Sequence, residues 1–221
     1  MSIVRLLLPD GSPVDLETHG EDDYLTRRLR SGWYELDLLQ AIQARNRPGI
    51  YVDAGAHIGS LSVWLGRCCP ATSLVCIEPF PASADILARN LARALDGRLP
   101  WAVLRSPLGE LAERVILGEP FNGNTGNVAG RPARKDDDGI ECMALDGLGL
   151  EGVALLKADV QGMEYEVLTG AAATIQRDHP LIAVEAMTEA EWARTSRHPA
   201  LEGYRILGRY CASPTYLLEH P

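Results

Sequence analysis

An aspartate and two glycines stand where a predicted strand meets a predicted helix. The segment reads Tyr51-Val-Asp-Ala-Gly-Ala-His-Ile-Gly59, and its apolar start ends at Asp53. Gly55 permits a tight turn, and Gly59 lets the new helix pack closely on the sheet. The next apolar run, Leu74-Val-Cys-Ile-Glu78, ends in a carboxylate, and Pro79 stops that strand. A carboxylate at this position can accept both hydroxyls of a ribose, so the two segments predict a nucleoside pocket.

The aspartate at position 53 indicates which of two kinds of nucleoside ligand the pocket would bind. The spacing here is Asp-x-Gly-x-x-x-Gly, whereas the dinucleotide fingerprint is Gly-x-Gly-x-x-Gly. An aspartate in place of the first glycine would repel a pyrophosphate. It suits a ligand that carries an ammonium and a sulfonium group, such as S-adenosylmethionine. His57, inside the loop, could contact the cofactor or the substrate, or simply fill space. The predicted cofactor-binding residues are Asp53, Gly55, His57, Gly59, Glu78 and Pro79.

Three more charged residues lie on later predicted strands. Lys157 and Asp159 alternate to one face of a strand, and Glu185 ends the run Leu181-Ile-Ala-Val-Glu185. Ligands of an open α/β sheet bind beyond the carboxyl ends of its strands, so we expect all three near the cofactor. Asp159 could act as a base, a substrate ligand or a metal ligand, or it could cap the helix that begins near Met163. A carboxylate pair without a third ligand is weak evidence for a metal, and none is predicted.

The elements that must position these residues alternate between strand and helix from residue 50 onward. Strands are predicted at 50–54, 73–78, 101–105, 153–159 and 181–186, and helices at 58–68, 82–95 and 163–177. This order predicts a parallel sheet with helices on both faces. Residues 204–207 and 215–219 flank Ala212-Ser-Pro214 and predict a terminal β-hairpin.

Two segments stand apart from this alternation. Residues 1–49 predict a hairpin, with strands at 3–8 and 14–16, followed by helices at 21–30 and 35–45. Residues 106–145 lack helical periodicity and predict short strands and loops around Asn122-Gly-Asn-Thr-Gly-Asn127. We expect both segments to lie on the acceptor side of the site, because loops of this kind vary with substrate.

Net charge, apolar runs and cysteine spacing argue against several classes of protein. The 221 residues carry a net charge of −9, and the one basic cluster, 131–135, is followed at once by three aspartates. A nucleic-acid partner is therefore not expected. The apolar runs are too short for a membrane span, and residues 1–9 lack a signal-peptide pattern. The five cysteines show no metal-ligand spacing and fit small core residues in a reducing cytosol, so a cytoplasmic protein is predicted. The sequence has no internal repeat or low-complexity segment, so we expect one domain.

Taken in order, these motifs resemble the FkbM-type methyltransferases. The resemblance covers roughly residues 21–186. It includes Tyr34-Glu35 at the entry of a lead-in helix, Tyr51-Val-Asp-Ala-Gly-Ala-His-Ile-Gly59, Ile77-Glu-Pro79, the segment 122–127, Leu145-Asp146, Leu155-Leu-Lys-Ala-Asp-Val-Gln-Gly-Met-Glu164, Val167-Leu-Thr-Gly-Ala171 and Ile182-Ala-Val-Glu185.

The resemblance implies a class I methyltransferase fold, which is a Rossmann-like α/β fold with a seven-stranded mixed sheet. It also implies S-adenosylmethionine as cofactor and a hydroxyl of a sugar or natural product as acceptor. Asp53, Gly55 and Gly59 would line the methionine end of the cofactor, Glu78 would hold its ribose, and Lys157 and Asp159 would face the transferring methyl group. One departure is Gln161, where the family usually has a glutamate, so a base or metal ligand is not expected there.

The predicted function is methyl transfer to a hydroxyl of a small molecule, with Asp159 as the first candidate for base or acceptor ligand and Lys157 or Glu185 assisting. Two alternatives stay open from the residues. One is an NAD(P)-dependent oxidoreductase on a related sheet, and the other is a degenerate methyltransferase that only binds a ligand or partner. The sequence does not decide the acceptor, nor whether the chain is a monomer or a homodimer.

Overall fold

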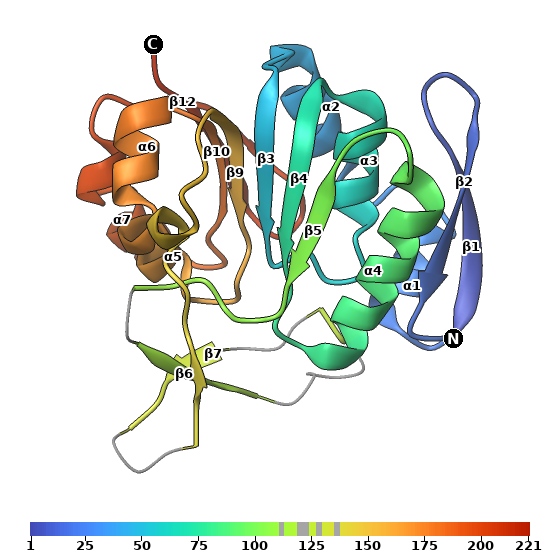
Figure 1. Cartoon of the computed structure of the whole chain (residues 1–221), viewed down its shortest axis with the longest axis horizontal. Helices are drawn as coiled ribbons and strands as arrows, with labels where there is room; N and C mark the ends of the chain where they lie inside the picture. Colours follow the sequence, from blue (N-terminus) through green and yellow to red (C-terminus); the bar gives the residue numbers. More distant parts are fainter. Residues whose placement is uncertain (111–112, 119–123, 127–129, 135–137) are drawn as a thin grey trace.

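A seven-stranded mixed sheet forms the centre of the protein in a computed structural model that describes residues 1–110, 113–118, 124–126, 130–134 and 138–221 (Figure 1). The strand order is β11-β12-β10-β9-β3-β4-β5. The five strands from β10 to β5 run parallel, and β12 is antiparallel to β10. Their bounds are β3 (Gly49–Ala54), β4 (Ala71–Ile77), β5 (Trp101–Leu104), β9 (Val153–Ala158), β10 (Leu181–Glu185), β11 (Arg205–Tyr210) and β12 (Thr215–Glu219).

Helices cover both faces of this sheet, as the sequence predicts (Figure 1). One face packs against α2 (Leu36–Arg45), α3 (Ser60–Cys68) and α4 (Pro81–Leu95), and the other against α5 (Glu164–Gly170) and α6 (Ala172–Asp178). Successive strand residues point to opposite faces. Tyr51 therefore joins the first buried cluster, and its neighbour Val52 joins the second. The remaining helical segments are α1 (Tyr24–Leu29), η1 (Leu145–Leu148), α7 (Glu189–Thr195) and η2 (Pro199–Leu201).

The N-terminal hairpin of β1 (Ser2–Leu7) and β2 (Pro13–Thr18) is confirmed and packs on α4. Its apolar side chains belong to the same buried cluster as those of α3 and α4. Asn90 of α4, fully buried, donates from Nδ2 to the carbonyl oxygens of Glu17 and Ile58, at 2.9 and 2.8 Å. The hairpin is thus joined to α4 by both apolar packing and buried hydrogen bonds, and Asn90 of α4 also bonds to the glycine loop.

The predicted insertion contains a small antiparallel sheet near the carboxyl edge of the main sheet (Figure 1). Its strands are β6 (Arg114–Leu117), β7 (Gly130–Pro132) and β8 (Ile140–Glu141), in the order β7-β6-β8. Part of the predicted 122–127 segment lies outside the described residues, and residues 124–126 are described. The terminal hairpin of β11 and β12 is also confirmed. Over the described residues, no helix combines the length and apolarity that crossing a membrane requires.

One predicted helix differs in detail from the structure, and one helix of the structure was not predicted. The helix predicted at 163–177 is broken at Ala171, whose backbone (φ −112°, ψ 6°) is not helical. The second part has its own N-terminal cap, because Asp146 accepts hydrogen bonds from the backbone N–H groups of Ala173 and Thr174. The helix α7 was not predicted. It begins with a capping box in which Thr188 and Glu191 each accept a hydrogen bond from the other's backbone N–H group.

Candidate active site

A cavity of about 170 Å³ opens at the carboxyl edge of the sheet, around the end of β3. This is where the chain switches from building the sheet on one side of β3 to building it on the other, and such switch points are the usual ligand sites of α/β folds. The cavity is lined by the glycine loop, the segment after β4, the ends of β9 and β10, the lead-in helices and the insertion. Among the lining residues are Tyr24, Tyr34, Glu35, Gly55, His57, Glu78, Phe80, Leu108, Thr125, Lys157, Asp159, Gln161 and Glu185.

Gly55 is required where the glycine loop meets the segment after β9. Its φ is +78°, and a Cβ atom there would lie 1.7 Å from the carbonyl oxygen of Asp159. Gly59 is favoured by its φ of +83°, and a Cβ atom there would also lie 2.5 Å from Cδ1 of Leu87 in α4. This close contact is with a helix, and the role of Gly59 in packing the helix on the sheet stays a prediction.

Asp53 lies beneath the cavity and does not line it. Its side chain is fully buried, and its carboxylate accepts a hydrogen bond from Ser62 and lies 3.2 Å from Nζ of Lys157. Asp53 and Lys157 are paired residues of the adjacent strands β3 and β9, which explains the contact. The direct contact with the methionine end of a cofactor that the resemblance implies would have to be made by the backbone of the loop above Asp53.

Lys157 connects that buried aspartate to the cavity. Its Nζ donates to the carbonyl oxygen of Gly55 at 2.9 Å and lies 3.5 Å from Oδ2 of Asp159. Burial by itself would lower the pKa of Lys157, but the carboxylates of Asp53 and Asp159 outweigh it and hold the pKa above its ordinary value. Lys157 therefore stays charged and lines the cavity as a fixed cation.

Glu78 follows β4 and links the glycine loop to the start of α4. Its two carboxylate oxygens accept hydrogen bonds from the backbone N–H groups of His57 and Phe80, both at 2.8 Å. Burial raises the pKa of Glu78 to about 7, against the opposing effect of these two hydrogen bonds. Each oxygen keeps a further lone pair, so the carboxylate can still accept hydroxyl groups of a ligand.

His57 joins three separate parts of the chain. Its ring stacks on that of His19 at a centroid distance of 5.3 Å, and its Nε2 lies 2.9 Å from Oγ1 of Thr125 in the insertion. Thr125 in turn donates to Asp23, the N-cap of α1, at 2.7 Å. Burial lowers the pKa of His57 to about 4, so the ring is neutral at physiological pH. A neutral ring holding the loop, the insertion and the lead-in together has a positioning role.

Asp159 and Glu185 lie together, as predicted for the ends of adjacent parallel strands. The amide Nε2 of Gln161 donates to both, at 2.8 Å to Asp159 and 3.0 Å to Glu185. Burial would raise the pKa of Asp159, but Lys157 and hydrogen bonds from Glu185 and Gln161 lower it. Burial and the charge of Asp159 raise the pKa of Glu185 well above its usual range. Glu185 thus holds its proton, and Asp159 is the anion of the pair.

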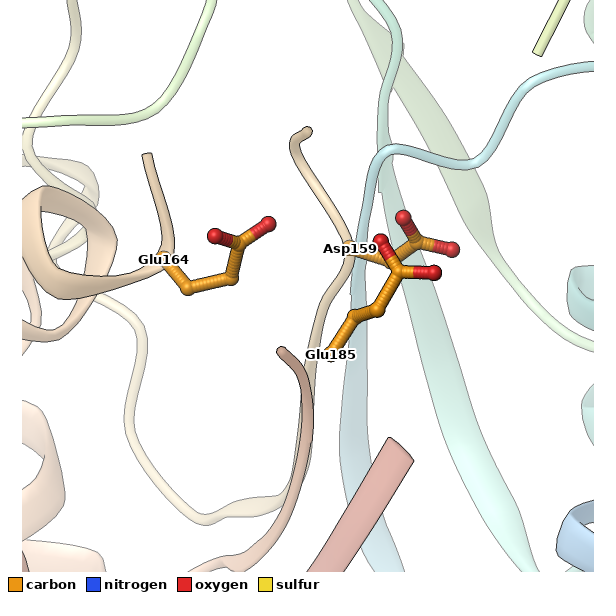
Figure 2. A group of neighbouring side chains, drawn as sticks. All are labelled: Asp159, Glu164 and Glu185. Atoms are coloured by element: carbon orange, nitrogen blue, oxygen red, sulfur yellow. The ribbon is translucent and has the colours of Figure 1, made fainter. Parts of the chain in front are cut away.

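Glu164 completes a group of three carboxyl groups whose oxygens lie within 4.8 Å of one another (Figure 2). Figure 2 shows Asp159 and Glu185 side by side, with Glu164 approaching from the start of α5. The oxygens of Glu164 already accept hydrogen bonds from the backbone N–H groups of Val160 and Gly162. Since the amide of Gln161 donates to the other two acids, we assign the group to hydrogen bonding rather than to a cation.

Comparison with known proteins shows the family to which the chain belongs. The model of the methyltransferase FkbM domain matches residues 53–204, which is more than half of the chain. The chain belongs to the FkbM methyltransferase family. This membership favours methyl transfer over the oxidoreductase alternative.

One curated protein is similar to the chain in sequence, and two solved structures are similar to it in fold. The methyltransferase sdnD of Sordaria araneosa is 27% identical over 184 residues, which cover 68% of this chain and 69% of that protein. The crystal structure of an FkbM methyltransferase from Methylobacillus flagellatus KT superposes with a TM-score of 0.57 at 23% identity and covers 79% of this chain. The match covers only 44% of the Methylobacillus flagellatus chain. Trm1 from Pyrococcus horikoshii, solved with S-adenosyl-L-methionine, has a TM-score of 0.55 at 12% identity, covering 99% of this chain and 61% of that one.

The lead-in helices add site residues to this FkbM domain that the motif analysis gave no role. Tyr24, Tyr34 and Glu35 line the cavity, and Glu35 lies close enough to Asp159 and Lys157 to interact with their charges. The Tyr34-Glu35 pair was visible as part of the resemblance. Its position at the cavity was not, because that depends on how α2 packs against the body of the protein.

Proposed function

We propose that this FkbM-family protein transfers the methyl group of S-adenosylmethionine to a hydroxyl oxygen of a small molecule. The observation that carries the proposal is one cavity shared by two kinds of residue. Glu78 and the glycine loop supply the features of a nucleoside site, and Asp159 and Lys157 supply a charged cluster beside it. The family membership supports the reaction class.

The residues present fit the cofactor. Glu78 has free lone pairs for the ribose hydroxyls, and Ile77, Phe80 and Leu108 provide apolar walls suited to an adenine ring. The anionic carboxylate of Asp159 suits the positive charge of a sulfonium. When bound, S-adenosylmethionine would supply an activated methyl group, so the protein's task is to align the acceptor and accept its proton.

The acceptor side supports a hydroxylated small molecule. Tyr24 and Tyr34 from the lead-in, Asn124 from the insertion and Ser213 from the terminal hairpin bring phenol, amide and hydroxyl groups to the cavity. We therefore assign segments 1–49 and 106–145 to acceptor recognition. The net charge of −9 disfavours a nucleic-acid acceptor. Asp159, held as an anion by Lys157, would accept a hydrogen bond from the acceptor hydroxyl and orient it.

The test is transfer of label from methyl-tritiated S-adenosylmethionine to a panel of sugars, polyols and hydroxylated natural products. Asp159→Asn keeps the size of the side chain and removes its charge, so we expect cofactor binding to persist while kcat falls. Undiminished turnover by Asp159→Asn would remove Asp159 from this role. Cofactor binding by the unmodified protein, with no methylated product from any acceptor, would favour the degenerate, binding-only alternative.

A further inference from the structure

Glu35 is an unusual residue for the start of a helix. It occupies the N-cap position of α2 in the left-handed region (φ 57°, ψ 34°), yet its side chain makes no capping hydrogen bond. A non-glycine residue in this conformation costs about 1–3 kcal/mol, and such strain gathers at functional sites. Two of the other positive-φ residues, His57 and Gln161, also line the cavity. The backbone of Glu35 is thus held in a strained form without a capping role to explain it.

The Glu35 carboxyl group also differs from the other acids around the cavity. Over the described residues, no hydrogen bond reaches its carboxylate from another side chain or from the backbone. By contrast, Glu78 accepts two backbone N–H groups, and Asp159 and Glu185 share the amide of Gln161. Burial, followed by the negative charge of Asp159, raises the pKa of Glu35 to about 7.

The neighbouring acids are poorly suited to removing a proton. Lys157 and the proton held by Glu185 make Asp159 a weak base, because both stabilise its anionic form. Glu185 already holds a proton at neutral pH, so it cannot take another from the acceptor hydroxyl. A general base works best when it is free to accept and its proton affinity matches the working pH.

We infer that Glu35 is the catalytic base that takes the proton from the acceptor hydroxyl, an assignment that rests on the proposed methyl transfer to oxygen. Glu35 accepts this proton as the acceptor oxygen bonds to the methyl carbon. The carbon–sulfur bond breaks in the same step, and its electron pair stays on sulfur to leave S-adenosylhomocysteine. Asp159 orients the hydroxyl, and Lys157 fixes Asp159. The two carboxylates therefore have separate tasks.

The proton affinity of Glu35 is set by groups from several elements. Asp159, Asp53 and Asp37 raise it by repulsion of the anion, and Lys157 lowers it. Tyr34 and Cys211 also interact with Glu35, but both thiol and phenol stay protonated near neutrality because burial raises the pKa of each. The base form of Glu35 therefore increases as pH rises through about 7, and kcat/KM should rise with it.

The first experiment uses no acceptor. The protein is labelled with ¹³C at its glutamate side-chain carboxyl groups, and the signal missing from Glu35→Gln identifies Glu35 for a pH titration with and without S-adenosylhomocysteine. We expect this carboxyl group to titrate near neutral pH. A Glu35 carboxyl that titrates in the ordinary range, near 4.3, would overturn the assignment by itself.

The second experiment compares Glu35→Gln with Glu202→Gln, a control glutamate exposed outside the cavity, on the acceptor found by the panel. We expect Glu35→Gln to lower kcat/KM by about a hundredfold or more, to lose the rise near pH 7, and to change the cofactor's Kd far less. Formate should partly restore Glu35→Ala. A Glu35→Gln variant with the activity and pH profile of the control would refute the base, whereas a wild-type protein that methylates no acceptor would refute the proposed function.

Discussion

Gly55 offers a sharp test of how the glycine loop and the Asp159 segment fit together. In Gly55→Ala, the added Cβ would lie 1.7 Å from the carbonyl oxygen and 2.8 Å from the carbonyl carbon of Asp159, both of them backbone atoms. The segments must separate by more than an ångström, which breaks the hydrogen bond from the Asp159 N–H to the carbonyl of Ala54. Gly97→Ala is a matched control, because its φ of +72° is similar and no atom lies within 4 Å of the added Cβ.

The left-handed strain is shared by both variants and costs about 1–2 kcal/mol. For a chain of this size, that strain lowers Tm by a few degrees, at about 2–4 °C per kcal/mol. The backbone clash in Gly55→Ala should bring its total cost to about 4 kcal/mol or more, which is diagnostic of a broken core contact. Differential scanning calorimetry measures Tm, and titration calorimetry measures S-adenosylmethionine binding. If Gly55→Ala matched Gly97→Ala in both, the close approach of the two segments would be wrong.

Three further predictions concern the charged groups. Lys157→Met leaves Asp53 as a buried, unpaired carboxylate and should cost about 3–5 kcal/mol in urea unfolding, whereas a small effect would mean that the buried pair adds little. Glu78→Gln keeps the size of the side chain but loses acceptor capacity, so S-adenosylmethionine should bind at least about tenfold more weakly by calorimetry, and unchanged binding would separate Glu78 from the ribose. Glu78 and Glu164 have pKa values of about 7, above their unfolded values, so the folded state holds protons that the unfolded state loses. The contribution of these two glutamates to the free energy of unfolding is therefore fully present below pH 4 and is lost as pH rises from about 5 to 7. Urea unfolding at several pH values measures this change, and a free energy of unfolding that does not fall over this range would contradict it.

The sequence predicted the positions of the site residues better than their contacts. Acids at the ends of parallel strands meet at one edge of the sheet, so Glu78, Asp159 and Glu185 could be brought together from the order of elements alone. The contact of Asp53 with Lys157 was not predicted, because strand register decides which residue lies beside Asp53. Its partner is Lys157 of β9, more than a hundred residues away, and no local pattern indicates that pairing.

Of the other differences between prediction and structure, one had a signal in the neighbouring sequence and two had none. The capping box at the start of α7 is readable as Thr188-Glu-Ala-Glu191, so this helix could have been predicted from sequence. The break at Ala171 could not, because the cap of α6 comes from Asp146, which belongs to a different element. The position of Glu35 at the cavity likewise depends on packing between segments and not on its neighbours in sequence.

Gln161 explains how three acids around one cavity can have different roles. A glutamate there would add a further carboxyl group beside Asp159 and Glu185, and the group would then need a cation or further protons to be stable. The amide of Gln161 instead donates to both acids, which favours one shared proton on Glu185 and a fixed negative charge on Asp159. Environments that separate the pKa values of neighbouring acids also separate their chemical roles. With that pair committed to each other, Glu35 is left as the carboxylate free to accept a proton, so the departure from the family's usual residue at 161 is compatible with catalysis.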